Sequence, residues 1–291
     1  MRAARLSTAH SRKVLPADVQ RGAATRATLP PVETSDTTDE LRVLANEHWR
    51  WFYRGLIESV GGEWRRYGNV DAFSTPHLPA AFANGVLAIE PALGTDLLTA
   101  TQWAQASGVP YRVRIDTTLG ADLFDAAREA GLECEEWTLP GMVLRPVPAA
   151  PPPAAGVTAE RVVAANYADF IQATVDCGMP REIAEQSFDL GATAHGDVDF
   201  FLGRLEGRPA ATATLVRTGD VAGIYAVATV EEARRRGLGA AVTWAAVSRA
   251  REWGSRAVIL QASPMGLHIY EAIGFRTVVE YAIFLPPGAT D

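Results

Sequence analysis

Six consecutive residues near the C-terminal end combine positive charge with glycine, namely Arg234, Arg235, Arg236, Gly237, Leu238 and Gly239. They follow a β-branched run and lead directly into an apolar helical pattern. A glycine-rich turn at a helix start leaves backbone N–H groups without intrahelical partners, and the helix dipole adds partial positive charge there. Guanidinium groups pair well with phosphate oxygens. The stretch therefore predicts an anion site, most naturally for phosphate.

Two common nucleotide-binding loops do not fit this stretch. A phosphate loop of the NTPase kind needs Lys and Ser/Thr after its last glycine, whereas Ala240 and Ala241 follow Gly239. A dinucleotide fingerprint needs a small residue where Val242 stands, and it follows a parallel strand, whereas the strands expected here are antiparallel. The pattern that remains is Arg-x-x-Gly-x-Gly after an antiparallel sheet.

That pattern resembles the pyrophosphate loop of the GNAT acetyltransferase superfamily. A second segment, residues 260–275, resembles that superfamily's second motif, with Tyr270 four residues before Gly274 and Phe275 directly after it. The expected elements from Val157 onward also come in the family's order. The resemblance to the superfamily's motifs covers the C-terminal half of the chain. The chain as a whole resembles two-domain, tandem GNAT proteins of bacteria.

The resemblance implies an acetyl-CoA site and direct acetyl transfer to an amine. Backbone groups of Val227 and Thr229 would pair with the pantetheine arm as an added strand. An N–H near Val227 would stabilise the oxyanion, and Tyr270 would protonate the departing thiolate. The coenzyme-binding residues expected from it are Val227, Ala228, Thr229, Arg234, Arg235, Arg236, Gly237, Leu238, Gly239, Ala240 and Ser263.

Several of these residues have simpler readings, and one role has no residue. The arginines could form a solvated corner, Tyr270 could be a packed aromatic, and Ser263, where the family often has asparagine, is explained as a helix cap. The expected strand 221–227 contains no Asp or Glu to serve as general base. Tyr225 or a chain of water molecules remains for that role.

The fold class expected is α+β, with two GNAT-like domains, each a mostly antiparallel mixed sheet flanked by helices and splayed at the acetyl-CoA site. The predicted division is a disordered leader at 1–38, a degenerate N-terminal domain at 39–145, a Pro/Ala-rich linker at 146–155 and a catalytic domain at 156–291. Each half shows strand, helix, an Ala-Gly or Ile-Gly pair and a further strand, which suggests duplication.

Only the C-terminal copy keeps the features of a coenzyme site. The N-terminal half has Gly94 at the comparable helix start but no Arg-x-x-Gly-x-Gly, and Ala127 stands where the other copy has Tyr270. We expect it to complete a wall of the acceptor site or to replace a dimer partner. One active site per chain is predicted.

Local patterns also predict where helices begin. Asp39 is the expected N-cap of a helix at 38–60, Thr95 that of a helix at 95–107, and Ser263 that of a helix running to Ala272. The aromatic residues Trp49, Trp51, Phe52 and Tyr53 fall at helical spacing, which favours core packing over a ligand wall.

Composition places the chain among cytoplasmic globular proteins, with 48% apolar residues and no run long enough to span a bilayer. The two cysteines are expected to be reduced, buried thiols, and no metal is predicted because the histidines lack zinc-type spacing. A single lysine with abundant Ala, Gly and Pro favours a bacterial source.

The expected partners are acetyl-CoA and an amine acceptor, with no nucleic acid and no membrane, in a monomer or homodimer. The first thirty residues carry six basic residues against one acid in a chain of net charge −7. This composition favours a disordered leader, with contact to another macromolecule as the alternative. The alternative function is therefore an acyl-CoA-binding sensor or interaction protein of weak catalytic power.

Overall fold

One mixed sheet runs through both halves of the chain in this computed structural model, which describes residues 37–289. Its eleven strands lie in the order β1-β2-β3-β4-β11-β5-β10-β9-β8-β7-β6. All neighbouring strands are antiparallel except β3 with β4 and β9 with β10. The predicted mixed, mostly antiparallel α+β fold is confirmed, and the described residues, 37–289, form one compact unit.

Residues 37–145 supply one long α-helix, two shorter α-helices and five strands. These elements are α1 (Thr38–Ser59), β1 (Glu63–Tyr67), β2 (Val70–Ser74), β3 (Gly85–Ala88), α2 (Gly94–Ala106), β4 (Arg112–Asp116), α3 (Ala121–Glu129) and β5 (Glu133–Leu144). The hairpin of β1 and β2 was not predicted, although Gly68-Asn69 between them is a turn signal.

Residues 146–289 supply four α-helices and six strands. They are β6 (Val157–Arg161), α4 (Tyr167–Asp176), α5 (Arg181–Ser187), β7 (Val198–Leu205), β8 (Arg208–Thr218), β9 (Val221–Thr229), α6 (Leu238–Glu252), β10 (Ala257–Gln261), α7 (Leu267–Ile273) and β11 (Arg276–Leu285). The predicted antiparallel pairing of β7, β8 and β9 is confirmed.

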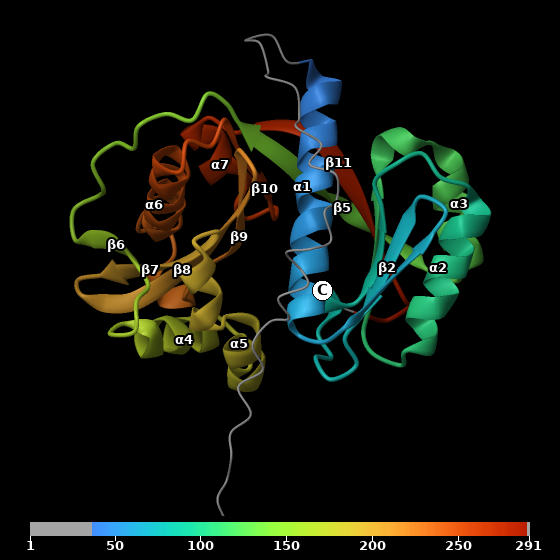
Figure 1. Ribbon diagram of the computed structural model, residues 1–291, viewed down its shortest axis with the longest axis horizontal. Coiled ribbons are helices and arrows are strands. Elements are labelled where there is room, and N and C mark those ends of the chain that lie inside the picture. The colour runs from blue at the N-terminus through green and yellow to red at the C-terminus, as the bar shows by residue number, and fades with distance from the viewer. Residues whose placement is uncertain (1–36, 290–291) are drawn as a thin grey trace, which may run out of the picture. The chain divides into compact units, whose positions relative to one another are not determined.

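The two halves repeat one order of elements and exchange their last strands. The order β3-α2-β4-α3-β5 in the first half matches β9-α6-β10-α7-β11 in the second. β5 pairs with β10 of the second half, whereas β11 pairs with β4 of the first, and the two strands also pair with each other (Figure 1). Each half therefore completes the other's part of the sheet.

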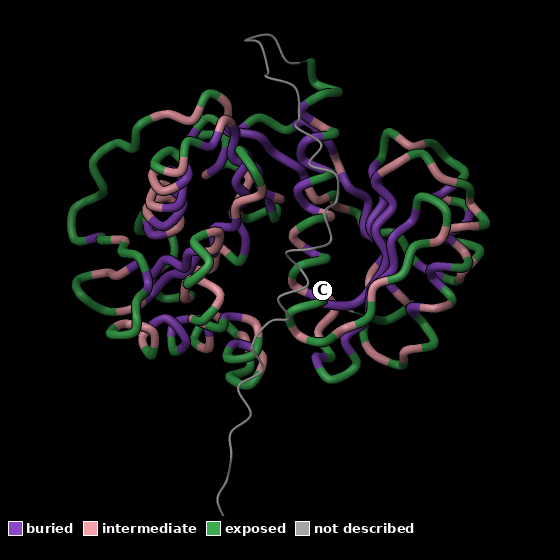
Figure 2. The backbone as a smooth tube through the Cα atoms, viewed as in Figure 1, coloured by how far each residue is buried: buried purple, intermediate pink, exposed green. Residues whose placement is uncertain are grey.

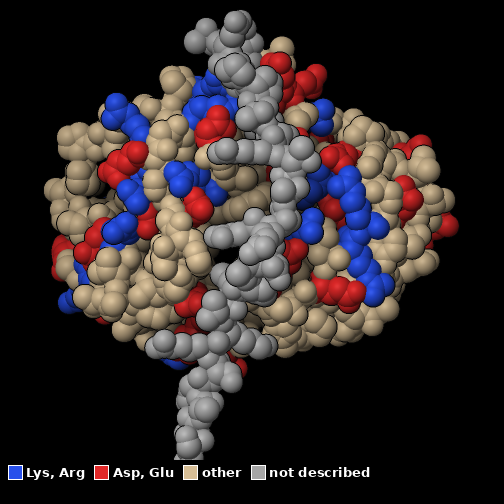
Figure 3. Space-filling model, in the orientation of Figure 1, with Lys and Arg blue, Asp and Glu red and all other residues tan. Residues whose placement is uncertain are grey.

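Helices cover both faces of the sheet. Alternate residues along β5 and β11 face either α1 or the opposite helices, as the period of two in a strand requires. α1, α4 and α5 lie on one face, and α2, α3, α6 and α7 lie on the other. The strands between these layers are largely buried (Figure 2), while acidic and basic side chains are interspersed over the face shown in Figure 3.

Three predicted helix N-caps are wrong by a few residues. Thr37, not Asp39, caps α1, because its side chain accepts from the Glu40 amide in a capping box. α2 begins at Gly94 after Leu93, with no side-chain cap. α7 begins at Leu267, since residues 263–266 form a separate turn in which Ser263 Oγ accepts from the Gly266 amide at 3.3 Å.

The predictions for the leader, the cysteines and membrane spans can be compared with the structure only over residues 37–289. The predicted leader at 1–38 lies outside them apart from its last two residues. Both cysteines are free, but neither is fully buried as predicted: Cys134, on β5, is exposed and Cys177 is partly buried. No helix within residues 37–289 is long and apolar enough to cross a membrane.

Candidate active site

The ends of β9 and β10 separate beside the predicted coenzyme loop. The two parallel strands pair only from Val221 with Ala257 to Gly223 with Ile259. Beyond that point β10 remains paired with β5, through Leu260 with Met142, while β9 continues to Thr229. Residues 224–229 and 260–261, called here the splayed ends, thus leave one edge of β9 without a strand partner.

A β-bulge deforms β9 where the strands separate. Thr214 of β8 faces Tyr225 and Thr212 faces Ala228, so one β8 residue opposes two residues of β9, Ala226 and Val227. Ala226 has φ of +51°, in the left-handed region that a residue with a β-carbon rarely adopts. Strain of this kind persists only where the surroundings fix it, and it gathers at functional sites.

The backbone after the bulge presents hydrogen-bonding groups to the unpaired edge. The Val230 amide donates to Ala210 O of β8 at 2.9 Å, so it faces away from β10. Because successive residues of a strand point their backbone groups to opposite sides, Thr229 and Val227 direct theirs toward the unpaired edge of β9, on the side of β10. This arrangement can accept an extended ligand as an added strand.

The loop at residues 233–240 carries unpaired amides. Ala233 is buried and anchors a 3-10 turn, and the chain then runs through Arg235 with φ of +60° and Gly237 with φ of +85°. Gly237 is the N-cap of α6 and offers no side-chain acceptor. Within the described residues the amides of 235–240 have no hydrogen-bond acceptor, since the first helical bond runs from Ala241 to Gly237.

The three predicted arginines of this loop differ in the contacts that their side chains make. Arg234 Nε lies 3.4 Å from Thr229 O, which ties the loop to the end of β9. Arg236 approaches Glu206 at 3.8 Å, and both side chains are more than half exposed, so the pair is weak. Arg235 is exposed and has no ion pair among residues 37–289. The three exposed arginines and the amides form a basic, anion-accepting surface.

Packing brings three of the predicted segments together. A β-carbon on Gly239 would lie 3.5 Å from Ile269 Cδ1 of α7 and 3.8 Å from Thr229 Oγ1 of β9. α6 buries Leu238, Val242, Ala246 and Ala250, spaced four residues apart, against β8 and β9. Val227 and Ile269 pack against the same core as Leu238 and Tyr270.

Tyr270 lies in that core on α7, 7% exposed. Its ring crosses Phe275 edge-on at 6.0 Å, and a β-carbon on Gly266 would come within 2.9 Å of its Cε2 atom. Burial raises the pKa of its phenol to about 12, so it is protonated at neutral pH. Ser263 Oγ lies 3.5 Å from the same position on Gly266, which places Ser263 beside Tyr270.

Tyr225 does not suit the role of base. Its side chain is on the α1 face, and its hydroxyl forms a 2.9 Å hydrogen bond with His48 Nδ1. Burial raises the pKa of Tyr225 well above 10, so it keeps its proton. The sequence gives no signal for this contact, because 177 residues separate its partners.

The equivalent place in the N-terminal half is closed. β3 pairs with β4 over its whole length, from Gly85 with Arg112 to Ala88 with Ile115. A β-carbon on Gly94 at the start of α2 would lie 3.2 Å from Asp122 O of α3. Asp96 adds an acidic side chain to the first turn, which disfavours an anion there.

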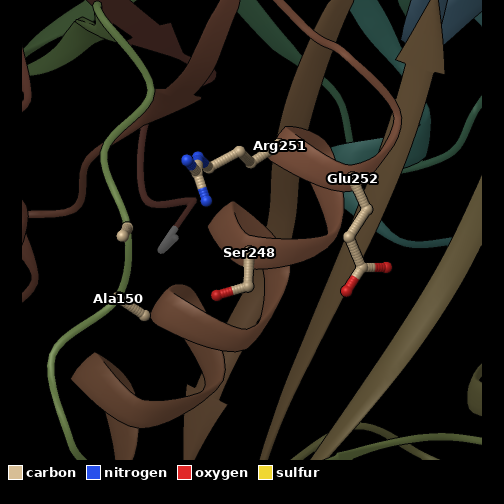
Figure 4. A pocket seen from close by; sticks show the side chains of 5 residues that line it. Ala150, Ser248, Arg251 and Glu252 are labelled. Carbon is tan, nitrogen blue, oxygen red and sulfur yellow. The ribbon is translucent and has the colours of Figure 1, made fainter.

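A surface pocket elsewhere has different lining. It is formed by Ala149 and Ala150 of the segment after β5 and by Ser248, Arg251 and Glu252 of α6 (Figure 4). Ser248 is ten residues from Leu238, about 15 Å along the helix at 1.5 Å per residue, so the pocket is remote from the loop. No group of three or more His, Cys, Asp or Glu residues within 37–289 could hold a metal ion.

Comparison with known proteins identifies the class of this site. Residues 166–275 match the model of the acetyltransferase (GNAT) family, and this part of the chain is a GNAT domain. The comparison with curated proteins found no match.

Solved structures show the same fold over most of the chain. A GCN5-related N-acetyltransferase from Kribbella flavida is 23% identical with a TM-score of 0.64, over 84% of this chain and 96% of that one. One from Sphaerobacter thermophilus is 15% identical with a TM-score of 0.58, over 77% and 82%. A tandem GNAT protein from the clavulanic acid biosynthesis pathway is 14% identical with a TM-score of 0.50, over 76% and 79%.

Proposed function

We propose that the protein is an acetyl-CoA-dependent N-acetyltransferase that acts on a small-molecule or peptide primary amine, with one active site in residues 156–291. The observation that carries the proposal is the conjunction of three features in a GNAT domain. These are the splayed ends of β9 and β10, the bulge at Ala226 and Val227, and the unpaired amides of the loop that begins α6.

The coenzyme would occupy the three features in order. The pantetheine arm adds to the edge of β9 through Val227 and Thr229, and the pyrophosphate binds the amides of 235–240 with Arg234 to Arg236 around it. Ala228 lies between the two pairing residues and Ser263 beside the thiol end, near Tyr270.

Transfer needs no covalent intermediate on the protein. The amine nitrogen attacks the thioester carbonyl carbon, the carbonyl oxygen takes the charge, and the Val227 amide stabilises it. The C–S bond then breaks, the ammonium nitrogen loses its proton to solvent, and coenzyme A leaves as thiol or thiolate.

Tyr270 assists the departing sulfur as a hydrogen-bond donor. A thiol titrates near 8.5, below the value of about 12 that burial gives the Tyr270 phenol. Complete proton transfer from the phenol to the thiolate is therefore uphill, whereas a hydrogen bond to the developing negative charge is favourable.

A second candidate function rests on the absence of a base. Among the described residues, β9 carries no carboxylate, and Tyr225 and His48 are buried and bonded to each other. This favours an acyl-CoA-binding sensor that transfers acetyl groups slowly or not at all.

Release of free thiol from acetyl-CoA distinguishes the two functions. The assay is run with the full chain across amino acids, aminoglycosides, polyamines and short peptides, and calorimetry measures coenzyme binding in parallel. Thiol release that depends on one class of amine supports the enzyme. Tight binding with no release for any amine supports the sensor, and no binding of acetyl-CoA contradicts both.

A further inference from the structure

The first helix of the N-terminal half contacts β9 immediately before its bulge. In Figure 1 α1 runs through the middle of the view, with α6 and α7 to one side and α2 and α3 to the other. Its side chains pack against β9, β10, β5 and β11. Two of these side chains, His48 and Phe52, are one helical turn apart and both contact Tyr225. Tyr225 directly precedes Ala226, the residue with positive φ.

His48 holds the Tyr225 hydroxyl. The Nδ1 atom and the hydroxyl oxygen are 2.9 Å apart and both side chains are buried. Because Tyr225 keeps its proton and burial lowers the pKa of His48 to about 4, both groups are neutral, and the direction of the hydrogen bond follows the tautomer of the imidazole. The other ring nitrogen of His48, Nε2, is buried in the protein interior.

Phe52 and Gly223 fix the remaining sides of the contact. The Phe52 ring stacks on the Tyr225 ring at 3.6 Å with an interplanar angle of 7°. His48 lies directly over Gly223, where an added β-carbon would be 2.5 Å from its Cε1 atom. The glycine therefore makes room for the imidazole, and β9 is held at positions 223 and 225.

The other side of α1 is anchored in the N-terminal half. Asn46 donates to the buried Asp116 of β4 at 3.0 Å, and Arg42 donates to the same carboxylate at 2.9 Å. Arg50 pairs with the buried Asp71 of β2 at 2.6 Å. Since α1 is bonded to two strands of that half, it cannot shift along β9 without breaking buried polar contacts.

We infer that His48 is a positioning residue: through Tyr225 it fixes the bulge at Ala226 and Val227, and with it the amide that binds the acetyl carbonyl. The inference rests on the proposed function, because that function gives the Val227 amide its role. It assigns the N-terminal half a part in catalysis without a ligand site of its own. The strained φ of Ala226 is the state that this contact maintains.

The test compares the affinities of coenzyme A and acetyl-CoA, because only acetyl-CoA has the carbonyl that the amide would bind. Calorimetry on the full chain gives the ratio of the two dissociation constants. His48→Phe and Tyr225→Phe each remove one partner and keep a ring of similar size. We expect both to reduce the preference for acetyl-CoA by about threefold to tenfold, the value of one hydrogen bond, with coenzyme A affinity unchanged. His48→Asn, which offers an oxygen near Nδ1, restores the preference.

Tyr281→Phe is the matched control. Tyr281 is also buried, and its hydroxyl donates to Asn46 of the same helix at 2.6 Å, but it lies on β11. It should lower the melting temperature and leave the ratio unchanged.

The outcomes separate the inference from the proposed function. A wild type that binds neither ligand overturns the proposed function. A wild type that binds both equally, a ratio preserved in both His48→Phe and Tyr225→Phe, or an equal loss in Tyr281→Phe overturns the inference alone.

Discussion

The ring of Tyr270 packs against the backbone of Gly266 so closely that a β-carbon on Gly266 would lie 2.9 Å from Tyr270 Cε2. The turn before α7 thus sets the position of the ring, and any side chain at Gly266 would displace it. This contact links the sequence motif around residues 260–275 to the placement of a single phenol.

Replacing Tyr270 with phenylalanine should lower kcat without weakening coenzyme binding. The ring remains packed against Gly266 and Phe275, while the hydroxyl that would donate to the departing sulfur is lost. We expect kcat to fall about 100-fold, the lower end of the range for proton-donating groups. Steady-state thiol release and calorimetry with coenzyme A measure the two effects.

The control for this substitution is Tyr111→Phe, which removes a buried phenol of the N-terminal half. Its kcat should equal that of the wild type. An equal loss of coenzyme affinity and kcat in Tyr270→Phe would show that Tyr270 only packs the core.

Gly239→Ala should raise the stability of the protein and weaken its binding of coenzyme A. Alanine favours a helix over glycine by about 1 kcal/mol, and its β-carbon meets Ile269 Cδ1 at an ordinary 3.5 Å. The same methyl group stands beside the amides proposed for the pyrophosphate, and loss of one charge-assisted hydrogen bond costs about 1.5–3 kcal/mol, roughly tenfold or more in affinity. Thermal melts measure the expected gain in stability, and calorimetry measures the expected loss of coenzyme A affinity.

Gly55→Ala is the corresponding control, since Gly55 is helical, exposed and has open space at its β-carbon. It should raise the melting temperature and leave coenzyme affinity unchanged. Unaltered affinity in Gly239→Ala would contradict the placement of the pyrophosphate.

The sequence predicts local features of the site well because their causes are local. Glycine at 237 and the apolar repeat from Leu238 place the start of α6 correctly, and β-branched residues predict β9 near its true bounds. The resemblance to the GNAT superfamily adds the separation of the strands, which is confirmed at Gly223 and Ile259.

Long-range relationships escape sequence reasoning. From the sequence, β5 and β11 could each lie beside β4 or beside β10, because both are apolar strands that follow a helix and a glycine. The contact of His48 with Tyr225 has no signature, since a histidine at helical spacing on an apolar face is ordinarily read as core. The positive φ in the bulge falls on Ala226 and not on a glycine, so the sequence does not predict it.

His48 should make the protein less stable in mild acid. Its pKa is near 6.5 when unfolded and about 4 when folded, because burial disfavours the charged ring. The unfolded chain therefore binds more protons between these values, so the stability present above pH 6.5 is lost as pH falls toward 4. The loss in the free energy of unfolding is about 2 kcal/mol at pH 5 and about 3 kcal/mol once the pH is below 4.

His48→Asn keeps a hydrogen-bond acceptor for Tyr225 but does not titrate. Urea unfolding of wild type and variant at pH 7.5 and 5.0 isolates the histidine, because the other acidic and basic groups are common to both. Equal losses in the two proteins would mean that His48 is accessible to protons in the folded state.

The exchange of β5 and β11 predicts that residues 155–291 will not fold alone. Without β5, β10 loses its partner at residues 141–144, and β11 loses both β4 and β5. An exposed edge of β10 and an unpaired β11 with buried residues such as Tyr281 and Phe284 favour aggregation. We expect the shortened chain to be insoluble and to become soluble when residues 1–145 are produced with it, because β5 then regains its place.

A chain cut only within the exposed segment 150–155 keeps every strand pair and should remain one particle in gel filtration. Separation of the two pieces after that cut, or a soluble, coenzyme-binding chain of 155–291, would show that the exchanged strands are dispensable.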